Sequence, residues 1–137
     1  MRARRVAEVA LLAALGCALP VERADKAASR AFAQQWLERL DAGDRAGAFQ
    51  QVSRLARARG SEEELVRRWF GMREPLGAVV ERSLQTNWRL DNLPSAPDGN
   101  YRELIYWSKF EHKDFVQEGL LLAFEDGGWK LITYRVH

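Results

Sequence analysis

The chain has 137 residues, 47% of them hydrophobic and 29% charged, which is the length of one domain and excludes a disordered chain. The formal net charge is only +2, and residues 1–18 hold three of the 21 basic and one of the 19 acidic side chains. The remaining 18 basic and 18 acidic side chains cancel. We therefore expect no nucleic-acid partner, because proteins that bind nucleic acids carry a basic surface.

The first 18 residues have the layout of an export signal. Arg2, Arg4 and Arg5 precede a nearly unbroken apolar run over residues 9–19, with small residues near its end. That run is too short for a membrane span, which requires about 20 residues. We therefore predict an exported protein, periplasmic or secreted, with no transmembrane segment in the mature chain. The alternative is that this segment is an amphipathic first helix of the folded domain.

Cys17 leaves two fates open for the signal. The residues "ALGC" at positions 14–17 resemble the lipobox of bacterial lipoproteins, in which the cysteine is acylated and becomes the new N-terminus. Ala14 stands where a large aliphatic residue is usual, and the alternative is cleavage near Ala18 to give a soluble product. In either case a lone cysteine excludes a disulfide within the chain, so stability must come from packing.

Three amphipathic helices are predicted in the first half of the mature chain, which we expect to form a single domain over residues 25–137. Asp25 is a suitable N-cap for the first helix and Asp44 for the second, which should close at Gly60. Ser61 and Glu64 form a capping box for the third. The predicted apolar stripes contain Phe32, Trp36 and Leu40, then Phe49, Val52 and Ala56, then Leu65, Trp69 and Met72.

Pro75 should end the third helix near Arg73, because proline disfavours helical geometry in the residue before it. Gly77 then allows the chain to bend into an extended segment. Alternating hydrophobicity and turn residues predict four strands, over residues 78–90, 101–110, 115–124 and 129–136. On the first of these strands, one face should carry Ala78, Val80, Arg82, Leu84, Thr86, Trp88 and Leu90.

Helices followed by strands with short connections predict an α+β fold, with three N-terminal helices packed on a curved four-stranded antiparallel meander. This arrangement resembles the cone of the nuclear transport factor 2-like and cystatin-like folds. The resemblance implies a pocket between the helices and the sheet.

Five stretches that follow one another along the chain carry a second resemblance. They are "AQQWLERLDAGD", "REPLGAVVER", "LPSAPDGNYRELIYWSKF", "FVQEGLLLAFED" and "GGWKLITYRV". Together they resemble the domain of unknown function 4019 family, a group of small exported bacterial proteins, over residues 30–136. The resemblance implies export and an α+β fold, and it implies no established activity.

The chain lacks the common signatures of catalysis and metal binding. It contains no CxxC pair, no histidine cluster and no glycine-rich phosphate loop, and its two histidines, His112 and His137, lie in a turn and at the end. No serine has a histidine partner in a recognisable motif. We therefore expect no metal and no cofactor, and we name no catalytic residue.

Two charged residues stand on otherwise apolar strand faces. Arg82 lies between Val80 and Leu84, and Glu118 lies between Val116 and Leu120. An unpaired charge there would cost several kcal/mol, so the two should meet each other or reach water. Which of these occurs depends on a strand register that the sequence does not define.

Three interpretations of Arg82 and Glu118 stay open. The pair can be a structural ion pair that holds the sheet. It can belong to a ligand pocket in which Arg82 holds an anionic or polar group and Trp36, Trp88 and Tyr106 form the walls. In the third interpretation Glu118 is a general base.

Ile105 and Trp107 should face away from the core on the second strand, where a second subunit or an envelope protein could cover them. The sequence as a whole favours an exported, non-catalytic binding or interaction module. The alternative is a small cone-type enzyme or small-ligand carrier that uses a pocket around Glu118 and Arg82.

Overall fold

The computed structural model describes residues 18–137, so Cys17 and the residues before it lie outside the described part. The helices are α2 (Ala18–Asp41), α3 (Arg45–Gln50), α4 (Arg54–Arg59) and α5 (Glu62–Arg73), followed by the 3-10 turn η1 (Glu74–Leu76). The strands are β1 (Val79–Leu90), β2 (Tyr101–Phe110), β3 (Lys113–Glu125) and β4 (Gly128–Val136). The prediction of an α+β protein is therefore confirmed.

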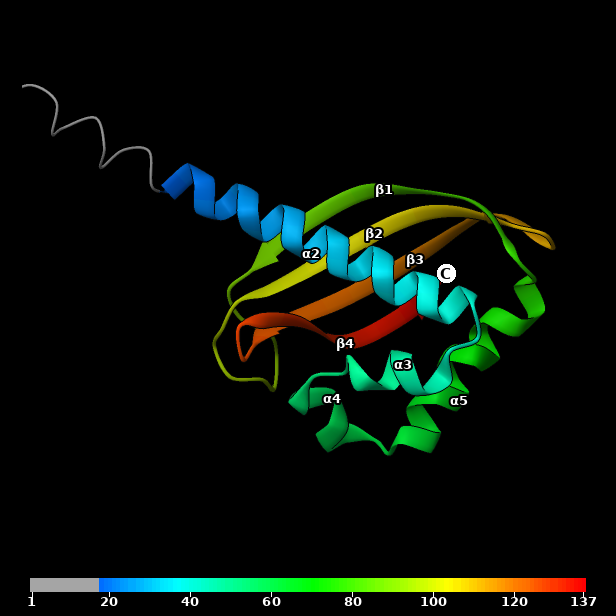
Figure 1. Ribbon diagram of the computed structural model, residues 1–137, viewed down its shortest axis with the longest axis horizontal. Coiled ribbons are helices and arrows are strands. Elements are labelled where there is room, and N and C mark those ends of the chain that lie inside the picture. The colour runs from blue at the N-terminus through cyan, green and yellow to red at the C-terminus, as the bar shows by residue number, and fades with distance from the viewer. Residues whose placement is uncertain (1–17) are drawn as a thin grey trace, which may run out of the picture.

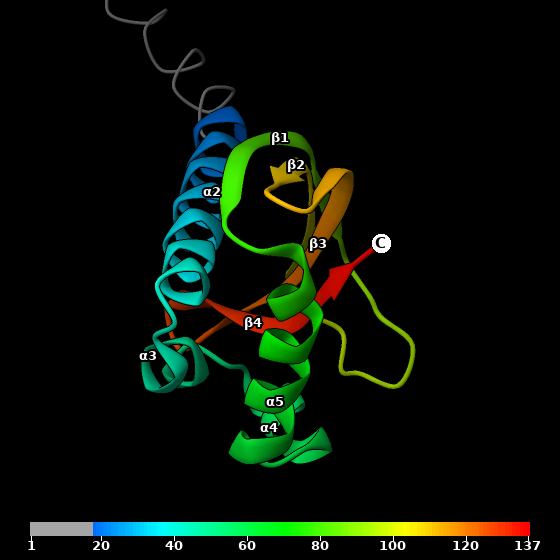
Figure 2. The same cartoon turned by 90° about the vertical axis from the view of Figure 1, so that its right-hand side faces the viewer.

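The strands form one antiparallel sheet in the order β1-β2-β3-β4, which confirms the predicted meander. Figure 1 shows α2 lying across one face of this sheet, while α3, α4 and α5 gather beside β4. Figure 2 shows from the side that the connection between β1 and β2 lies on the opposite face. We call the face under α2 the inner face and the opposite one the outer face.

Helix α2 starts earlier than predicted. Asp25, the expected N-cap, lies inside a helix that already includes Ala18. The residues between them are mostly good helix formers. Glu22 also gains a partner on the sheet, since Arg102 Nη2 donates to its Oε1 at 2.5 Å. Packing therefore extends the helix beyond the point at which a capping residue could have started it.

The predicted second helix is broken in two, so that there are four α-helices among the described residues where three were expected. The break lies at Val52, which pairs with Leu131 of β4 in an isolated parallel bridge. The backbone N–H of Ser53 donates to Leu131 O at 2.8 Å, and Leu131 N–H donates to Gln51 O at 2.8 Å. Ser53 then caps α4 by accepting from Ala56 N–H at 3.1 Å. Hydrogen bonding to the free edge of β4 thus outweighs continuation of the helix.

The predicted faces of β1 are correct only in the middle of the strand. The pairing with β2 shifts between Val79 and Glu81 and again between Leu84 and Thr86, so one extra residue enters at each place. Each extra residue reverses which side chains face inward. As a result Val80 is 60% exposed and Trp88 is 62% exposed, although both were predicted to face the core. Arg82 and Leu84 lie between the two bulges and face inward, as predicted.

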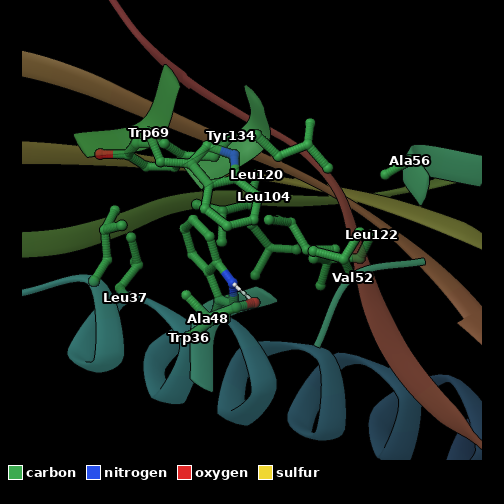
Figure 3. Close-up of a cluster of buried hydrophobic side chains, with 14 of the residues drawn as sticks. Trp36, Leu37, Ala48, Val52, Ala56, Trp69, Leu104, Leu120, Leu122 and Tyr134 are labelled. Carbon is green, nitrogen blue, oxygen red and sulfur yellow. Dashed lines mark hydrogen bonds between the residues drawn. The ribbon is translucent and has the colours of Figure 1, made fainter. Parts of the chain in front are cut away.

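The main core fills the space between α2, α5 and the inner face of the sheet (Figure 3). Trp36 lies at its centre, fully buried, and its Nε1–H donates to Ala48 O at 3.0 Å. Its ring packs edge-on against Trp69 and at a tilt against Tyr134, both with centroids 5.2 Å away. Such pairs contribute about 0.5–1.5 kcal/mol each beyond their burial. Trp36 is therefore a core residue that joins both helices to β4.

Helix α5 ends at Arg73, as Pro75 predicts, and Gly77 turns the chain into β1 with φ 77° and ψ −159°. This backbone conformation is open essentially only to glycine. A Cβ at position 77 would also lie 2.9 Å from His112 Cδ2 and 3.0 Å from Glu111 Cβ. We expect Gly77→Ala to lower the free energy of unfolding by about 1–3 kcal/mol in urea titrations.

Gly71→Ala is the matched control for that substitution. Gly71 is exposed on α5, and a Cβ added there would meet no atom of another described segment within 4 Å. Because alanine is the better helix former, Gly71→Ala should raise stability by up to about 1 kcal/mol. Equal effects of the two substitutions would contradict a conformational requirement at Gly77.

Candidate functional site

Glu118 and Arg82 meet on the inner face of the sheet. Glu118, on β3, is fully buried, and Arg82 reaches it from β1 across the strand between them. Arg82 Nε donates to Glu118 Oε1 at 2.7 Å, and its Nη2 donates to Oε2 at 3.2 Å. This is the two-pronged geometry in which a guanidinium binds a carboxylate most strongly.

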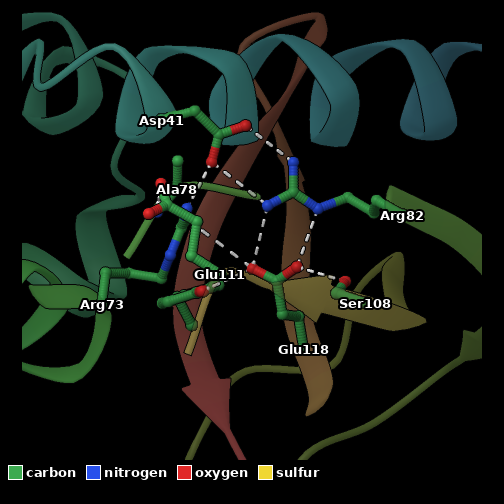
Figure 4. Close-up of polar contacts among 8 residues, drawn as sticks. Asp41, Arg73, Ala78, Arg82, Ser108, Glu111 and Glu118 are labelled. Carbon is green, nitrogen blue, oxygen red and sulfur yellow. Dashed lines mark hydrogen bonds and ion pairs between the residues drawn. The ribbon is translucent and has the colours of Figure 1, made fainter. Parts of the chain in front are cut away.

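Other side chains complete the surroundings of the Glu118 carboxylate (Figure 4). Ser108 Oγ donates to Oε1 at 2.5 Å, and Tyr134 Oη donates to Oε2 at 2.5 Å. Arg73 Nη1 lies 3.7 Å from Oε2. Each carboxylate oxygen therefore accepts two hydrogen bonds, and a second guanidinium stands beside them.

Asp41, in the last turn of α2, joins the two arginines from the other side. Its Oδ1 accepts from Arg73 Nη2 at 2.6 Å and from Arg82 Nη2 at 3.2 Å, and its Oδ2 accepts from Arg82 Nη1 at 2.8 Å. We call Asp41, Arg73, Arg82 and Glu118 the charge cluster. Its two positive and two negative charges cancel, which is how a fold makes buried charge tolerable.

The charge cluster also shifts the ionisation of its members. Burial alone would raise the pKa of Asp41, but hydrogen bonds and charges from Arg82 and Arg73 outweigh it and hold that pKa below its usual value. Burial lowers the pKa of Arg82, yet the hydrogen bonds to Asp41 and Glu118 leave it raised overall. Burial and the Glu118 charge raise the pKa of Tyr134, so its hydroxyl stays a donor.

This geometry leaves Glu118 little chemistry to perform. A general base must accept a proton from a substrate within hydrogen-bond reach. Glu118 has no exposed surface, and its oxygens already accept from Arg82, Ser108 and Tyr134. The arrangement is suited to holding β1, β3, β4 and the ends of two helices in place.

Asp41 and Arg73 were missed at the level of sequence, although a signal was present. Asp41 lies four residues after Leu37, and Arg73 lies four residues after Trp69, so each continues the buried stripe of its helix. A charge on that stripe indicates a partner in the interior. Ser108 and Tyr134 carried no such signal, because serine is uncharged and tyrosine is common on half-buried strand surfaces.

The proposed pocket walls lie in three different places. Trp36 is fully buried in the core, and Trp88 points outward because of the second bulge of β1. Tyr106 is 6% exposed, faces inward beside Arg82, and lines a hollow. Ile105 is half-buried and Trp107 is 45% exposed, both on the outer face.

A second buried arginine ties the first half of α2 to the sheet. Arg102, on β2, is fully buried, and its Nη1 donates to Asn87 Oδ1 at 3.1 Å while its Nη2 binds Glu22. The side-chain amide of Asn87 in turn donates to Ser29 Oγ at 3.0 Å on α2. Helix α2 is thus fastened at both ends, here and at Asp41. The sequence pattern did not indicate this contact, because it depends on the bulge that turns Asn87 inward.

An open groove runs between α2 and β1. It consists of two adjoining hollows of about 490 Å³ and 520 Å³, which share Arg30, Gln34 and Leu84. One hollow reaches Tyr106 and Arg82, and the other extends along α2 toward Lys26 and Arg23. We call this the α2–β1 groove.

The family described as "Protein of unknown function (DUF4019)" matches residues 32–134. The chain belongs to the DUF4019 family. This confirms the resemblance seen in the sequence, and the DUF4019 match includes all four members of the charge cluster. Neither the curated proteins nor the solved structures with which the chain was compared include a match.

Residues 18–137 contain neither a helix suited to spanning a membrane nor a cluster of side chains suited to binding a metal. Within that range no helix combines the length and the apolar character that crossing a membrane would require. The described residues also bring together no group of three or more His, Cys, Asp or Glu side chains suited to holding a metal ion.

Replacing Glu118 by glutamine should be strongly destabilising. In the position of Oε2, the amide nitrogen of glutamine is a donor and would face three other donors, the Tyr134 hydroxyl, Arg82 Nη2 and Arg73. The buried Arg73 and the half-buried Arg82 would then share the single charge of Asp41. We expect Glu118→Gln to lower the free energy of unfolding by about 3–5 kcal/mol in urea titrations.

Glu81→Gln is the matched control, because Glu81 is exposed on β1 and makes no ion pair with a described residue. That change should alter stability by less than about 0.5 kcal/mol. A Glu118→Gln protein as stable as the Glu81→Gln protein would show that the charge cluster does not hold the fold.

Asp41 should make the stability of the fold depend on pH in the acid range. Because its pKa is lower in the folded state, its contribution is complete above the unfolded pKa of about 3.9 and is lost as pH falls through the folded pKa. We expect Asp41→Asn to lower stability at pH 7 by about 1–3 kcal/mol. Between about pH 5 and pH 2 the variant should lose less further stability than the parent protein.

The measurement for Asp41 is thermal unfolding at a series of pH values. Asp98→Asn serves as the control, since Asp98 is exposed in the connection between β1 and β2. Parallel pH profiles for the parent protein and Asp41→Asn would exclude Asp41 as a source of the acid dependence.

Proposed function

We propose that the protein is an exported, non-catalytic binding module of the bacterial envelope. One observation carries the binding part of this proposal: the α2–β1 groove is open, and Tyr106, one of its wall residues, has a buried hydroxyl with no hydrogen-bond partner among the described residues. An unpaired buried hydroxyl costs about 1–3 kcal/mol unless a partner satisfies it. A ligand that enters the groove and moves the side chains covering this hydroxyl would supply that partner.

The charge cluster supports a non-catalytic role. Glu118 is enclosed and its oxygens are occupied, so it is a poor candidate for the base that the alternative, a small cone-type enzyme, would require. Arg82 is occupied in the same way, with contacts from Nε and both Nη atoms. The pair is therefore better explained as a structural brace, and a ligand would bind beside it.

The remaining parts of the proposal concern export, fold and partners. Export rests on the signal-like residues 1–18, with either cleavage near Ala18 or acylation of Cys17. The position of α2 across the curved sheet supports a nuclear transport factor 2-like or cystatin-like cone. A structure that superposes on neither fold would exclude this assignment. The outer face around Ile105 and Trp107 is our candidate for a partner or homodimer contact.

Native mass spectrometry of the protein purified from its own envelope tests these parts together. We expect a polypeptide that lacks the signal, or that carries lipid on Cys17, with an additional bound mass that leaves on collisional activation. A polypeptide that retains Met1 and is found only in the cytoplasmic fraction would contradict export. If the protein is a dimer that Trp107→Ala converts to a monomer, this would support a homodimer contact on the outer face. If the Trp107→Ala protein keeps the mass of the parent assembly, the outer face is not the homodimer contact.

A pair of substitutions at alanine positions locates the bound mass. Ala31 lines the α2–β1 groove, whereas Ala28 is also exposed on α2 but lies outside it. Ala31→Trp should fill the groove and abolish the bound mass, and Ala28→Trp should retain it. A bound mass that survives in both variants would show that the ligand binds elsewhere.

A further inference from the structure

The α2–β1 groove has a basic end. Arg23, Lys26 and Arg30 follow one another at helical spacing on α2, and all three line the groove. None of them lies within ion-pair distance of a described carboxylate. Three uncompensated positive charges along one wall favour an anionic ligand.

The opposite end of the groove would repel such a ligand. Glu38 lines that end and accepts a hydrogen bond from Gln34 Nε2 at 3.2 Å. Arg82 also lies there, but its guanidinium is neutralised by Asp41 and Glu118. The anion should therefore lie nearer Arg30 than Arg82, the arginine that the pocket interpretation of the sequence had named.

Tyr106 can complete the site from the sheet. Its hydroxyl is buried and unpaired, and its side chain lines the same hollow as Arg30. Burial raises the pKa of Tyr106, although the positive charges of Arg30 and Arg82 offset part of the effect. The hydroxyl is therefore protonated at neutral pH, and it can donate to an anion beside Arg30 once the side chains that cover it move aside.

The number of donors favours phosphate over carboxylate. Two arginines, a lysine and a hydroxyl approach from two walls, and a phosphate monoester offers three terminal oxygens and up to two negative charges. Between the cations the walls are apolar, formed by Ala27, Ala31 and Leu84. A ligand that matches both features has a phosphate head and an aliphatic part.

From this geometry we infer that the α2–β1 groove binds a phosphate-bearing amphiphile, with the phosphate at Arg30, Lys26 and Tyr106 and the aliphatic part against Leu84. The inference rests on the proposed function and adds the chemical class of the ligand. Such a phosphate has two sources, a soluble alkyl phosphate and the headgroup of a lipid such as phosphatidic acid.

Isothermal titration calorimetry with octyl phosphate below its micelle concentration tests the inference. We expect saturable binding that Arg30→Gln weakens by about 10- to 100-fold, the loss typical of a charged hydrogen bond. Tyr106→Phe should weaken it by about 2- to 10-fold. Arg68→Gln, which removes an exposed arginine on α5 that pairs with no described carboxylate, should leave the affinity unchanged.

Two further probes separate the parts of the ligand. Octanoate should bind at least about 10-fold more weakly than octyl phosphate, since it carries a single charge. Inorganic phosphate should also bind more weakly, because it leaves the apolar wall uncovered. Equal affinity for octanoate would overturn the choice of phosphate, and equal affinity for inorganic phosphate would overturn the amphiphile.

The source of the phosphate is decided with vesicles of phosphatidylcholine that do or do not contain phosphatidic acid. Cosedimentation only with phosphatidic acid, reversed by octyl phosphate and lost in Arg30→Gln, would support a lipid headgroup. Binding of octyl phosphate without cosedimentation would support a soluble ligand. No calorimetric binding would overturn the inference, and a bound mass that Ala31→Trp still abolishes would show that the proposed binding function survives with another ligand class.

Discussion

The contact between Arg82 and Glu118 is the constraint on which the rest of the structure depends. Glu118 is fully buried, and an unpaired carboxylate there would cost several kcal/mol. Arg82 must therefore reach across β2 from the inner face of β1, where its pairing opposite Ser108 places it. The same guanidinium also binds Asp41, so the end of α2 is positioned by the sheet. One buried charge thus determines how β1, β3 and α2 are arranged.

This brace has a consequence for where a ligand can bind. The inner face of the sheet under α2 is filled by the charge cluster and by the aromatic core around Trp36. On that face, space remains among the described residues at the side of α2, where the helix passes β1. Because Glu22 and Asp41 fasten α2 to Arg102 and Arg82, the walls of that groove are held before any ligand arrives. Preformed walls reduce the ordering cost of binding.

Sequence reasoning succeeded where local chemistry decides the structure. Pro75, the strand alternation and the turn residues predicted the end of α5, the four strands and their meander, and alternation placed Arg82 and Glu118 inward. It failed where tertiary hydrogen bonding decides. The residue types do not indicate the extra residues in β1 that turn Trp88 outward. Nor do they indicate the bridge from Val52 to Leu131 that divides the predicted second helix. The inward positions of Asp41 and Arg73 could have been predicted, because each residue extends the apolar stripe of its helix.

The two kinds of arginine in this chain explain why the ligand role moves from Arg82 to Arg30. An arginine in the interior must be neutralised by the fold itself, so the pairing that permits its burial also occupies its donors. An arginine at the groove can stay unpaired, because water screens its charge until a ligand replaces the water. The overall neutrality of the domain does not contradict an anion site, since cancellation over the whole surface says nothing about a single wall. The charges available for binding a ligand are those that are not already paired within the fold.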